Sequence, residues 1–143
     1  MSAGADLANA NLAGARLSNA NLAGSNLAGA NLAGADLSSA ILTGVRSGGI
    51  KGKPSLPSGW LLFHGYLLGP GANLGGANFV NLDFGSLDLS GVNLNGAKLA
   101  GTKLGNVLLS GGPFTVQGVP ETLPTGWTIQ RDRWSNQLIP PPK

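Results

Sequence analysis

Several residue types on which enzymes and secreted domains depend are missing or scarce in this chain of 143 residues. There is no cysteine, which excludes a disulfide framework, and a single histidine with six carboxylates excludes most metal clusters. Charged residues make up 10% and aromatic residues 6%, too few large side chains to fill an ordinary mixed core. The hydrophobic fraction of 42% argues against disorder, because disordered chains are poor in apolar residues. The interior is therefore expected to consist of small, repeated layers.

Long apolar runs are also absent. The longest, Trp60–Phe63, is far shorter than the run of about 20 residues that spans a bilayer. Residues 1–20 have neither the basic start nor the apolar stretch of a signal peptide. We expect a soluble protein with no membrane insertion, cytoplasmic or incorporated in a particle such as a virion.

Leucine or phenylalanine recurs at every fifth position in two blocks of the chain. These positions are Leu7, Leu12, Leu17, Leu22, Leu27, Leu32, Leu37, Leu42, Leu74, Phe79, Phe84, Leu89, Leu94, Leu99, Leu104 and Leu109. Two positions before each lies a mostly small residue, and two positions after each lies only Gly, Asn or Ser. A period of five matches neither a helix nor a continuous strand, but it fits a short extended segment followed by a corner.

The side chains of such a segment divide into inward and outward sets. The central Leu or Phe and the residue two before it point the same way, as alternate strand residues do. The residue between them, for example Asn11 or Arg16, then points outward. Gly, Asn or Ser suits the corner because a corner favours a positive φ. We therefore expect the sixteen Leu and Phe side chains to form the structural core.

This pattern closely resembles the pentapeptide repeat family, whose consensus is a small residue, Asp or Asn, Leu and two small residues. The resemblance covers residues 5–44 and 72–111. It implies an all-β fold, a right-handed quadrilateral β-helix with twenty residues per coil, here about four coils.

Each block is followed by a segment in which the same three motifs occur in the same order. Ser-Gly-Gly, Gly-x-Pro and Leu-Pro-x-Gly-Trp begin at residues 47, 52 and 56, and again at residues 110, 118 and 123. The chain is therefore an internal duplication, either one continuous domain or two tandem modules. Its parts are repeat block 1 (1–44), excursion 1 (45–71), repeat block 2 (72–111), and excursion 2 with a proline-rich tail (112–143).

Each excursion is expected to contain a β-hairpin. Residues 60–63 and 66–68 flank a turn at His64-Gly65, and residues 127–130 and 137–139 are their counterparts. An open β-helix end leaves unpaired backbone groups, and capping elements usually cover such ends.

The aromatic residues of the hairpins have two interpretations. Trp60, Tyr66 and Trp127 are expected to pack the hairpins against a coil end or flank. The alternative is an exposed contact for a partner, for which Phe63 and Trp134 are the best candidates. Trp134 with Arg131 and Arg133 forms the sharpest candidate contact cluster, because these residues lie outside the repeats.

No catalytic, metal-binding or cofactor-binding residue is expected. His64 falls in a turn without a cysteine, a Ser–Asp pair or a second histidine to assist it. Asp83 and Asp88 occupy outward positions of neighbouring repeats, so they do not form a converging carboxylate pair. With Leu and Ala filling the interior, we expect no small-molecule substrate and no enzymatic activity.

Three binding roles remain open. The resemblance implies one of them, mimicry of DNA toward a topoisomerase, which needs a strongly acidic surface; the net charge of +3 argues against it. Nucleic-acid binding is suggested by the pI of 9.7, but the basic residues are scattered. We expect a non-enzymatic structural or protein-interaction module. Its partners would be other protein subunits, in a homo-oligomer or a larger assembly such as a virion or surface layer.

Overall fold

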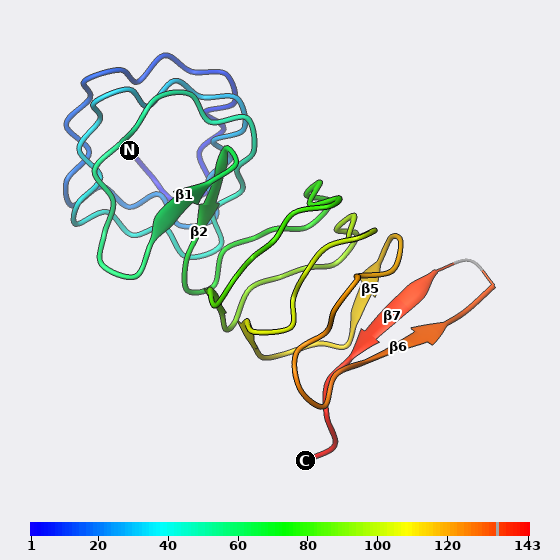
Figure 1. Cartoon of the computed structure of the whole chain (residues 1–143). Coiled ribbons are helices and arrows are strands. Elements are labelled where there is room, and N and C mark those ends of the chain that lie inside the picture. Colours follow the sequence, from blue (N-terminus) through cyan, green and yellow to red (C-terminus); the bar gives the residue numbers. More distant parts are fainter. Residues whose placement is uncertain (134) are drawn as a thin grey trace. The chain divides into compact units, whose positions relative to one another are not determined.

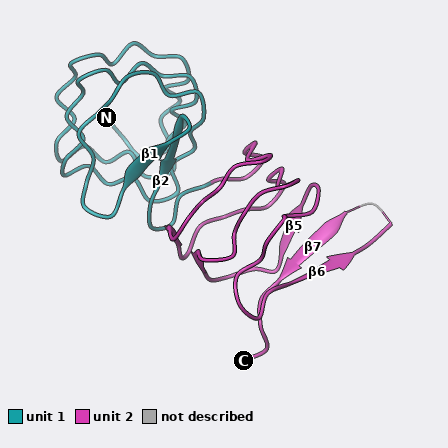
Figure 2. Cartoon of the chain, in the orientation of Figure 1, with its two compact units in different colours: residues 1–73 teal, residues 74–143 magenta. Residues whose placement is uncertain are grey.

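The computed structural model describes residues 1–133 and 135–143, and these residues form no helix. The fold is therefore all-β across this part of the chain, as expected. The chain divides into two compact units, residues 1–73 and residues 74–143 (Figures 1 and 2).

Unit 1 is built on parallel β-bridges that join residues twenty positions apart. The bridged pairs are Asp6–Asn26, Asn11–Asn31, Arg16–Asp36, Asn21–Ile41, Asn26–Arg46 and Asn31–Lys51. Each bridge is closed by two backbone hydrogen bonds: the Leu7 N–H donates to the Asn26 C=O at 2.8 Å, and the Asn26 N–H donates to the Ala5 C=O at 2.9 Å. Four pentapeptides therefore separate each residue from the one stacked on it.

The corners between bridges are tight turns. The N–H of Ala10 donates to the C=O of Leu7 at 3.0 Å, and the residue before Ala10, Asn9, has a φ of 60°. A positive φ at the third position of a hydrogen-bonded turn defines type II, which favours Gly or Asn there. In unit 1 every Gly or Asn at the corner position has a positive φ and Ser39 does not, so the corner residue selects the turn.

The central Leu side chains fill the interior of unit 1. Leu22, Leu27, Leu32 and Leu37 are fully buried. Across both units, thirteen of the sixteen central side chains are buried; Leu7, Leu12 and Leu109 are only partly buried, which differs from the expectation for the whole set. Leu7 and Leu12 belong to the first repeats of the ladder, where no earlier coil covers them.

One inward position of unit 1 carries a polar atom. The Oγ of Ser25 is buried without a hydrogen-bond partner in the described part of the chain, and the inward positions before and after it in the repeat hold alanine. A buried hydroxyl without a partner costs about 1–3 kcal/mol. Thr102, at an inward position of a different repeat in unit 2, is also buried, but its hydroxyl donates to the Phe79 C=O at 2.8 Å.

We therefore expect Ser25→Ala to raise the free energy of unfolding by about 1 kcal/mol. Thr102→Val, the matched control, should lower it by about 1 kcal/mol, because it removes a satisfied hydrogen bond. Urea denaturation followed by circular dichroism measures both. Destabilisation by Ser25→Ala would show that this hydroxyl has a partner in solution.

The bridge ladder of unit 1 continues beyond residue 44. Arg46 and Lys51 keep the twenty-residue offset, Ser55 pairs with Asp36 at an offset of nineteen, and Asn73 pairs with Arg46. Between Ser55 and Asn73 lies the hairpin of β1 (Leu61–Phe63) and β2 (Tyr66–Leu68), which pair antiparallel as expected. Excursion 1 therefore extends the ladder and carries a hairpin as an insertion.

The Ser-Gly-Gly motif at residues 47–49 receives this hairpin. The N–H of Leu67 donates to the Ser47 Oγ at 2.9 Å, and the N–H of Ile50 donates to the Gly65 C=O at 3.1 Å. The ring of Tyr66 lies on Gly48, where a Cβ would be only 3.0 Å from the ring. The motif thus combines a hydroxyl acceptor with a surface free of side chains.

Unit 2 repeats the ladder and ends in a small sheet. The bridges Asn78–Lys98 and Asp83–Lys103 are followed by β3 (Asp88–Leu89), which pairs parallel with β4 (Leu108–Leu109). The expected hairpin is present as β6 (Thr128–Arg131) and β7 (Asn136–Ile139). The sequence did not predict β5 (Phe114–Val116), which joins them in the order β5-β7-β6.

Candidate functional site

The outward surface of unit 1 consists of columns of bridged residues. One column runs Asp6, Asn26, Arg46 and Asn73, and the others run Asn11, Asn31 and Lys51; Arg16, Asp36 and Ser55; and Asn21 and Ile41. Side-chain amides link some neighbours: Asn26 Nδ2 donates to Asp6 Oδ1, and Asn31 Nδ2 to Asn11 Oδ1, both at 3.2 Å. These columns carry five asparagines and five charged residues of both signs.

The aspartates of the outward columns have a local structural role. Oδ1 of Asp36 accepts hydrogen bonds from the Ser38 N–H at 3.0 Å and from the Ser38 hydroxyl at 2.6 Å. These bonds, the hydroxyl first, lower the pKa of Asp36, and Ser90 lowers the pKa of Asp88 in the same way. A lowered pKa keeps the carboxylate ionised, so these groups are poor proton donors.

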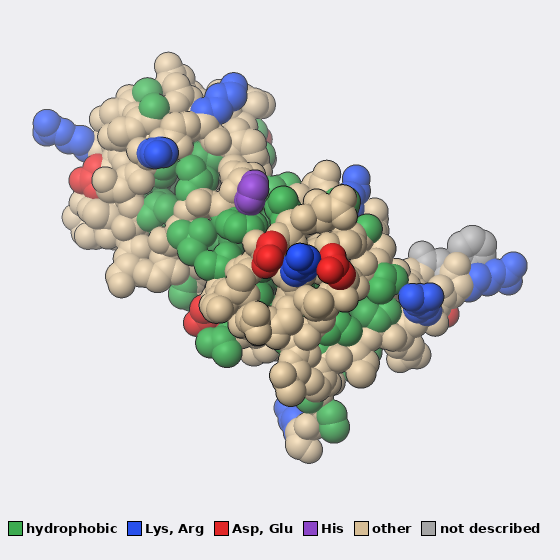
Figure 3. All heavy atoms as spheres, in the orientation of Figure 1, with side chains coloured by type: hydrophobic (Ala, Val, Ile, Leu, Met, Phe, Trp, Pro, Cys, Tyr) green, Lys and Arg blue, Asp and Glu red, His purple; other side chains and the backbone are tan. Residues whose placement is uncertain are grey.

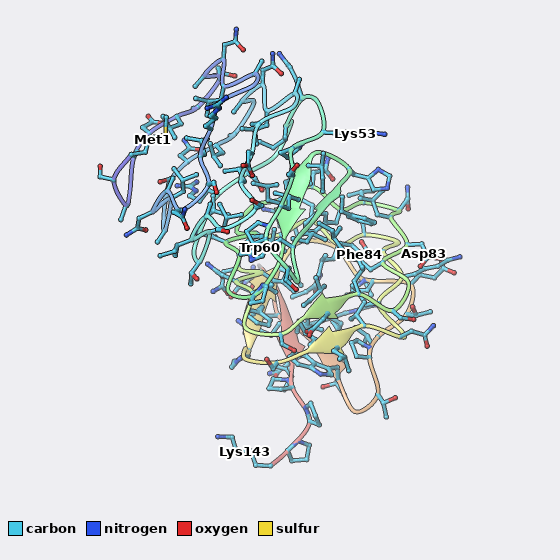
Figure 4. The ribbon with its side chains drawn as sticks, turned by 90° about the vertical axis from the view of Figure 1, so that its left-hand side faces the viewer. Met1, Lys53, Trp60, Asp83, Phe84 and Lys143 are labelled. Carbon is cyan, nitrogen blue, oxygen red and sulfur yellow. The ribbon has the colours of Figure 1, made fainter. Side chains whose placement is uncertain are left out.

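Unit 2 mixes charges in the same manner. Lys103 is bridged to Asp83, and Lys98 is bridged to Asn78. Acidic and basic side chains lie interspersed on the face seen in Figure 3, and Asp83 extends away from the ribbon in Figure 4. A DNA mimic needs a continuous acidic surface, and these columns do not provide one.

Two apolar side chains stand at outward positions where amides or charges predominate. Ile41 is 52% exposed and Leu108 is 63% exposed. The sequence analysis did not single them out, although an apolar residue at the outward pentad position is a signal that could have found them. Leu108 also borders a cleft of about 460 Å³ in unit 2, lined in addition by Trp127, Pro124 and Pro141.

The aromatic residues of the first hairpin lie between core and surface. Trp60 is partly buried, packs against the core of unit 1 and lies on Gly69, where a Cβ would overlap its ring (Figure 4). Phe63, a candidate contact residue, is partly buried and has its ring centroid 4.6 Å from that of His64, edge to face. His64 occupies the turn with a φ of 47°, as its sequence position suggested.

In the second hairpin the aromatic residue Trp127 is buried, whereas the charged residues near the link are exposed. Trp127 is 7% exposed and stacks on Phe114, with ring centroids 6.2 Å apart and ring planes 4° apart. Arg131, the last residue of β6, and Arg133, in the link, are both exposed. The Asp132 N–H closes the link by donating to the Ser135 C=O at 2.8 Å. Trp134, the third member of the candidate contact cluster, lies outside the described residues.

The other cleft of unit 2 does not assemble a catalytic set. It has a volume of about 570 Å³ and is lined by Thr115, Gln117, Asp132, Ser135 and Asn136, together with backbone of neighbouring residues. Asp132 is its one titratable side chain among the described residues. In the same part of the chain, no three His, Asp or Glu side chains gather as a metal site would require, and no helix has the length and apolar character to cross a membrane.

Comparison with known proteins identifies the repeat. No curated protein matches the chain. The family model of pentapeptide repeats matches residues 5–44 and 71–111, more than half of the chain. Those segments coincide with the two blocks in which Leu or Phe recurs at every fifth position. The chain therefore belongs to the pentapeptide repeat family.

Proposed function

We propose that this chain is a non-enzymatic structural and protein-interaction module, a subunit or decoration of a larger assembly such as a virion or surface layer. Membership of the pentapeptide repeat family supports a non-catalytic interaction module. We further propose that the ladders form a right-handed quadrilateral β-helix of about four coils, because the bridges recur at a twenty-residue offset in both units.

The observation that carries this proposal is the filled interior. The stacked Leu and Ala side chains of unit 1, such as Leu32 and Ala35, have no exposed surface. A ligand therefore has to bind to the outward columns, the hairpins or the coil ends. Columns that mix amides with charges of both signs suit contact with a complementary protein surface, whereas chemistry needs converging titratable groups.

The proposed partner contacts are Arg131, Arg133 and Trp134 in one unit and, separately, Phe63 in the other. Arginine and aromatic side chains are enriched among the residues that dominate binding energy at protein interfaces. Neither arginine belongs to a repeat, so both can vary without disturbing a ladder.

Native particles from the source that encodes this chain provide the test. We expect the chain to co-sediment with virions or surface layers in a density gradient, at a fixed ratio to their main subunit by quantitative mass spectrometry. Adding Arg131→Ser/Arg133→Ser protein to stripped particles should give at least about 10-fold weaker rebinding, the loss of roughly two interface contacts. Lys53→Ser, which removes an exposed charge outside the bridged columns and the second hairpin, is the control. Recovery of the chain only as free protein would overturn the assembly role.

A further inference from the structure

The first coil of unit 1 has an incompletely covered interior. Leu7, Leu12 and Ala15 are partly buried, whereas Leu27, Leu32 and Ala35, twenty residues later, are fully buried. The residues before the first bridge do not close this end: the N–H of Gly4 donates to the Ala23 C=O at 2.8 Å, and Met1 is 57% exposed. Inward-pointing apolar side chains are therefore only partly covered at this end.

The backbone at the same end has unused hydrogen-bonding groups. In the second coil, each bridge residue directs both its N–H and its C=O to the coil before it; Asn26, for example, donates to Ala5 and accepts from Leu7. The corresponding residues of the first coil are Asp6, Asn11, Arg16 and Asn21. Their backbone N–H and C=O groups have no hydrogen-bond partner among the described residues. Such an edge is a template for pairing with another strand.

The charges at this edge favour one particular arrangement of two copies of the chain. Asp6, Asn11, Arg16 and Asn21 lie at equal spacing within one twenty-residue period, so Asp6 and Arg16 are half a coil apart. A two-fold axis in the plane of the edge, through Asn11 and Asn21, exchanges the positions of Asp6 and Arg16. Two copies related by that axis place each Asp6 opposite an Arg16 and each asparagine opposite its own equivalent. The perpendicular axis in the same plane places like charges together and is disfavoured.

We propose that this edge, residues 5–24, is a self-association surface through which two copies of the chain stack end to end with two-fold symmetry. In an antiparallel arrangement, directly opposed residues exchange both N–H···O bonds, which is what the orientation of these backbone groups allows. The contact would cover Leu7 and Leu12, and its isologous symmetry makes it a closed dimer. This inference rests on the proposed interaction module and names one partner for it, a second copy of this chain.

Charge reversal tests the contact on the purified chain of residues 1–143. Asp6→Arg places the introduced arginine opposite Arg16 twice, and Arg16→Asp places the introduced aspartate opposite Asp6 twice. We expect either single variant to weaken the dimer by at least about 10-fold at low salt, an effect that high salt reduces. Mixing the two variants should restore a dimer, because each then supplies the charges that the other needs. Asp83→Arg, a reversal at an outward column of unit 2, should leave association unchanged.

Size-exclusion chromatography with light scattering measures the molar mass in solution, which is compared with the chain mass of 14.3 kDa. Circular dichroism verifies that each variant is folded, and the mixed sample provides a positive result even where single variants are partly destabilised. A wild-type chain that stays monomeric at millimolar concentration overturns the inference. So does a dimer that neither reversal weakens. Both results concern purified protein alone, so either is distinguishable from failure of particle association, which would overturn the proposed function instead.

Discussion

Gly52→Ala should lower the free energy of unfolding by about 3 kcal/mol, combining backbone strain with overpacking. Gly52 has a φ of 80°, and a Cβ there would lie 2.6 Å from the backbone nitrogen of Ala33. The obstacle is backbone of a neighbouring coil, which has no alternative rotamer to adopt. Urea denaturation followed by tryptophan fluorescence and circular dichroism measures the loss.

Gly14→Ala is the matched control for this effect. Gly14 has a φ of 68°, and a Cβ there would meet nothing within 4 Å. It isolates the backbone strain, for which we expect about 1 kcal/mol. If the two substitutions cost the same, the close approach of Gly52 to Ala33 is not present in solution. Gly118 lies on Ala100 in the same way. In both units, therefore, the Gly-x-Pro motif needs glycine because a neighbouring backbone leaves no room for a Cβ.

Leu32→Ala should cost about 3–5 kcal/mol, the range for truncating a fully buried leucine in a core that cannot collapse around the cavity. Leu32 has no exposed surface and belongs to a cluster of buried residues that includes several other leucines. Leu12, one coil earlier in the same column, is only partly buried. Leu12→Ala should therefore cost about half as much, because part of its surface is already in water.

Both leucine variants are best compared in the Asp6→Arg background and at low protein concentration, since the proposed dimer would bury Leu12 further. Denaturant midpoints and slopes from circular dichroism report the two costs. Equal costs in that background would mean that the first coil is as well covered as the second, and would remove the open edge on which the dimer rests.

In the repeat blocks, the local sequence pattern predicted the direction of the side chains and the position of the corners. The five-residue period predicted that Leu32 points inward and Asn31 outward, and that a corner follows at Gly34, because each role depends on neighbours a few residues away. The outward columns were predicted as solvated positions for the same reason. The exposure of Leu7 and Leu12 was not predicted, because it depends on whether a coil lies below them and not on their own repeat.

In the excursions, the local sequence pattern did not predict the physical role of the recurring motifs. The sequence marked Ser-Gly-Gly and Gly-x-Pro as recurring motifs without assigning them a physical role. The structure provides one for each: Ser47 accepts from Leu67 across twenty residues, and Gly52 lies on the backbone of Ala33. Both are contacts between distant segments, which no periodicity within a segment can encode.

The candidate contact residues follow the same division. The sequence marked Arg131, Arg133 and Phe63 because they lie outside the repeats. In the structure both arginines are exposed, Arg131 at the end of β6 and Arg133 in the link, and Phe63 lies beside a turn. Whether they contact a partner stays a prediction. The cleft beside Leu108 needed the structure, since Trp127 and Pro141 of the last segment also line it.

By itself, the sequence determined the alternation of inward and outward side chains, the corner chemistry and the family, because these properties repeat within every five residues. The tertiary structure decided where the ladder ends, how the hairpins dock and which leucines are left partly open at the first coil. Those outcomes depend on backbone groups and side chains brought together from different coils, and an exposed edge exists only once the coils are stacked.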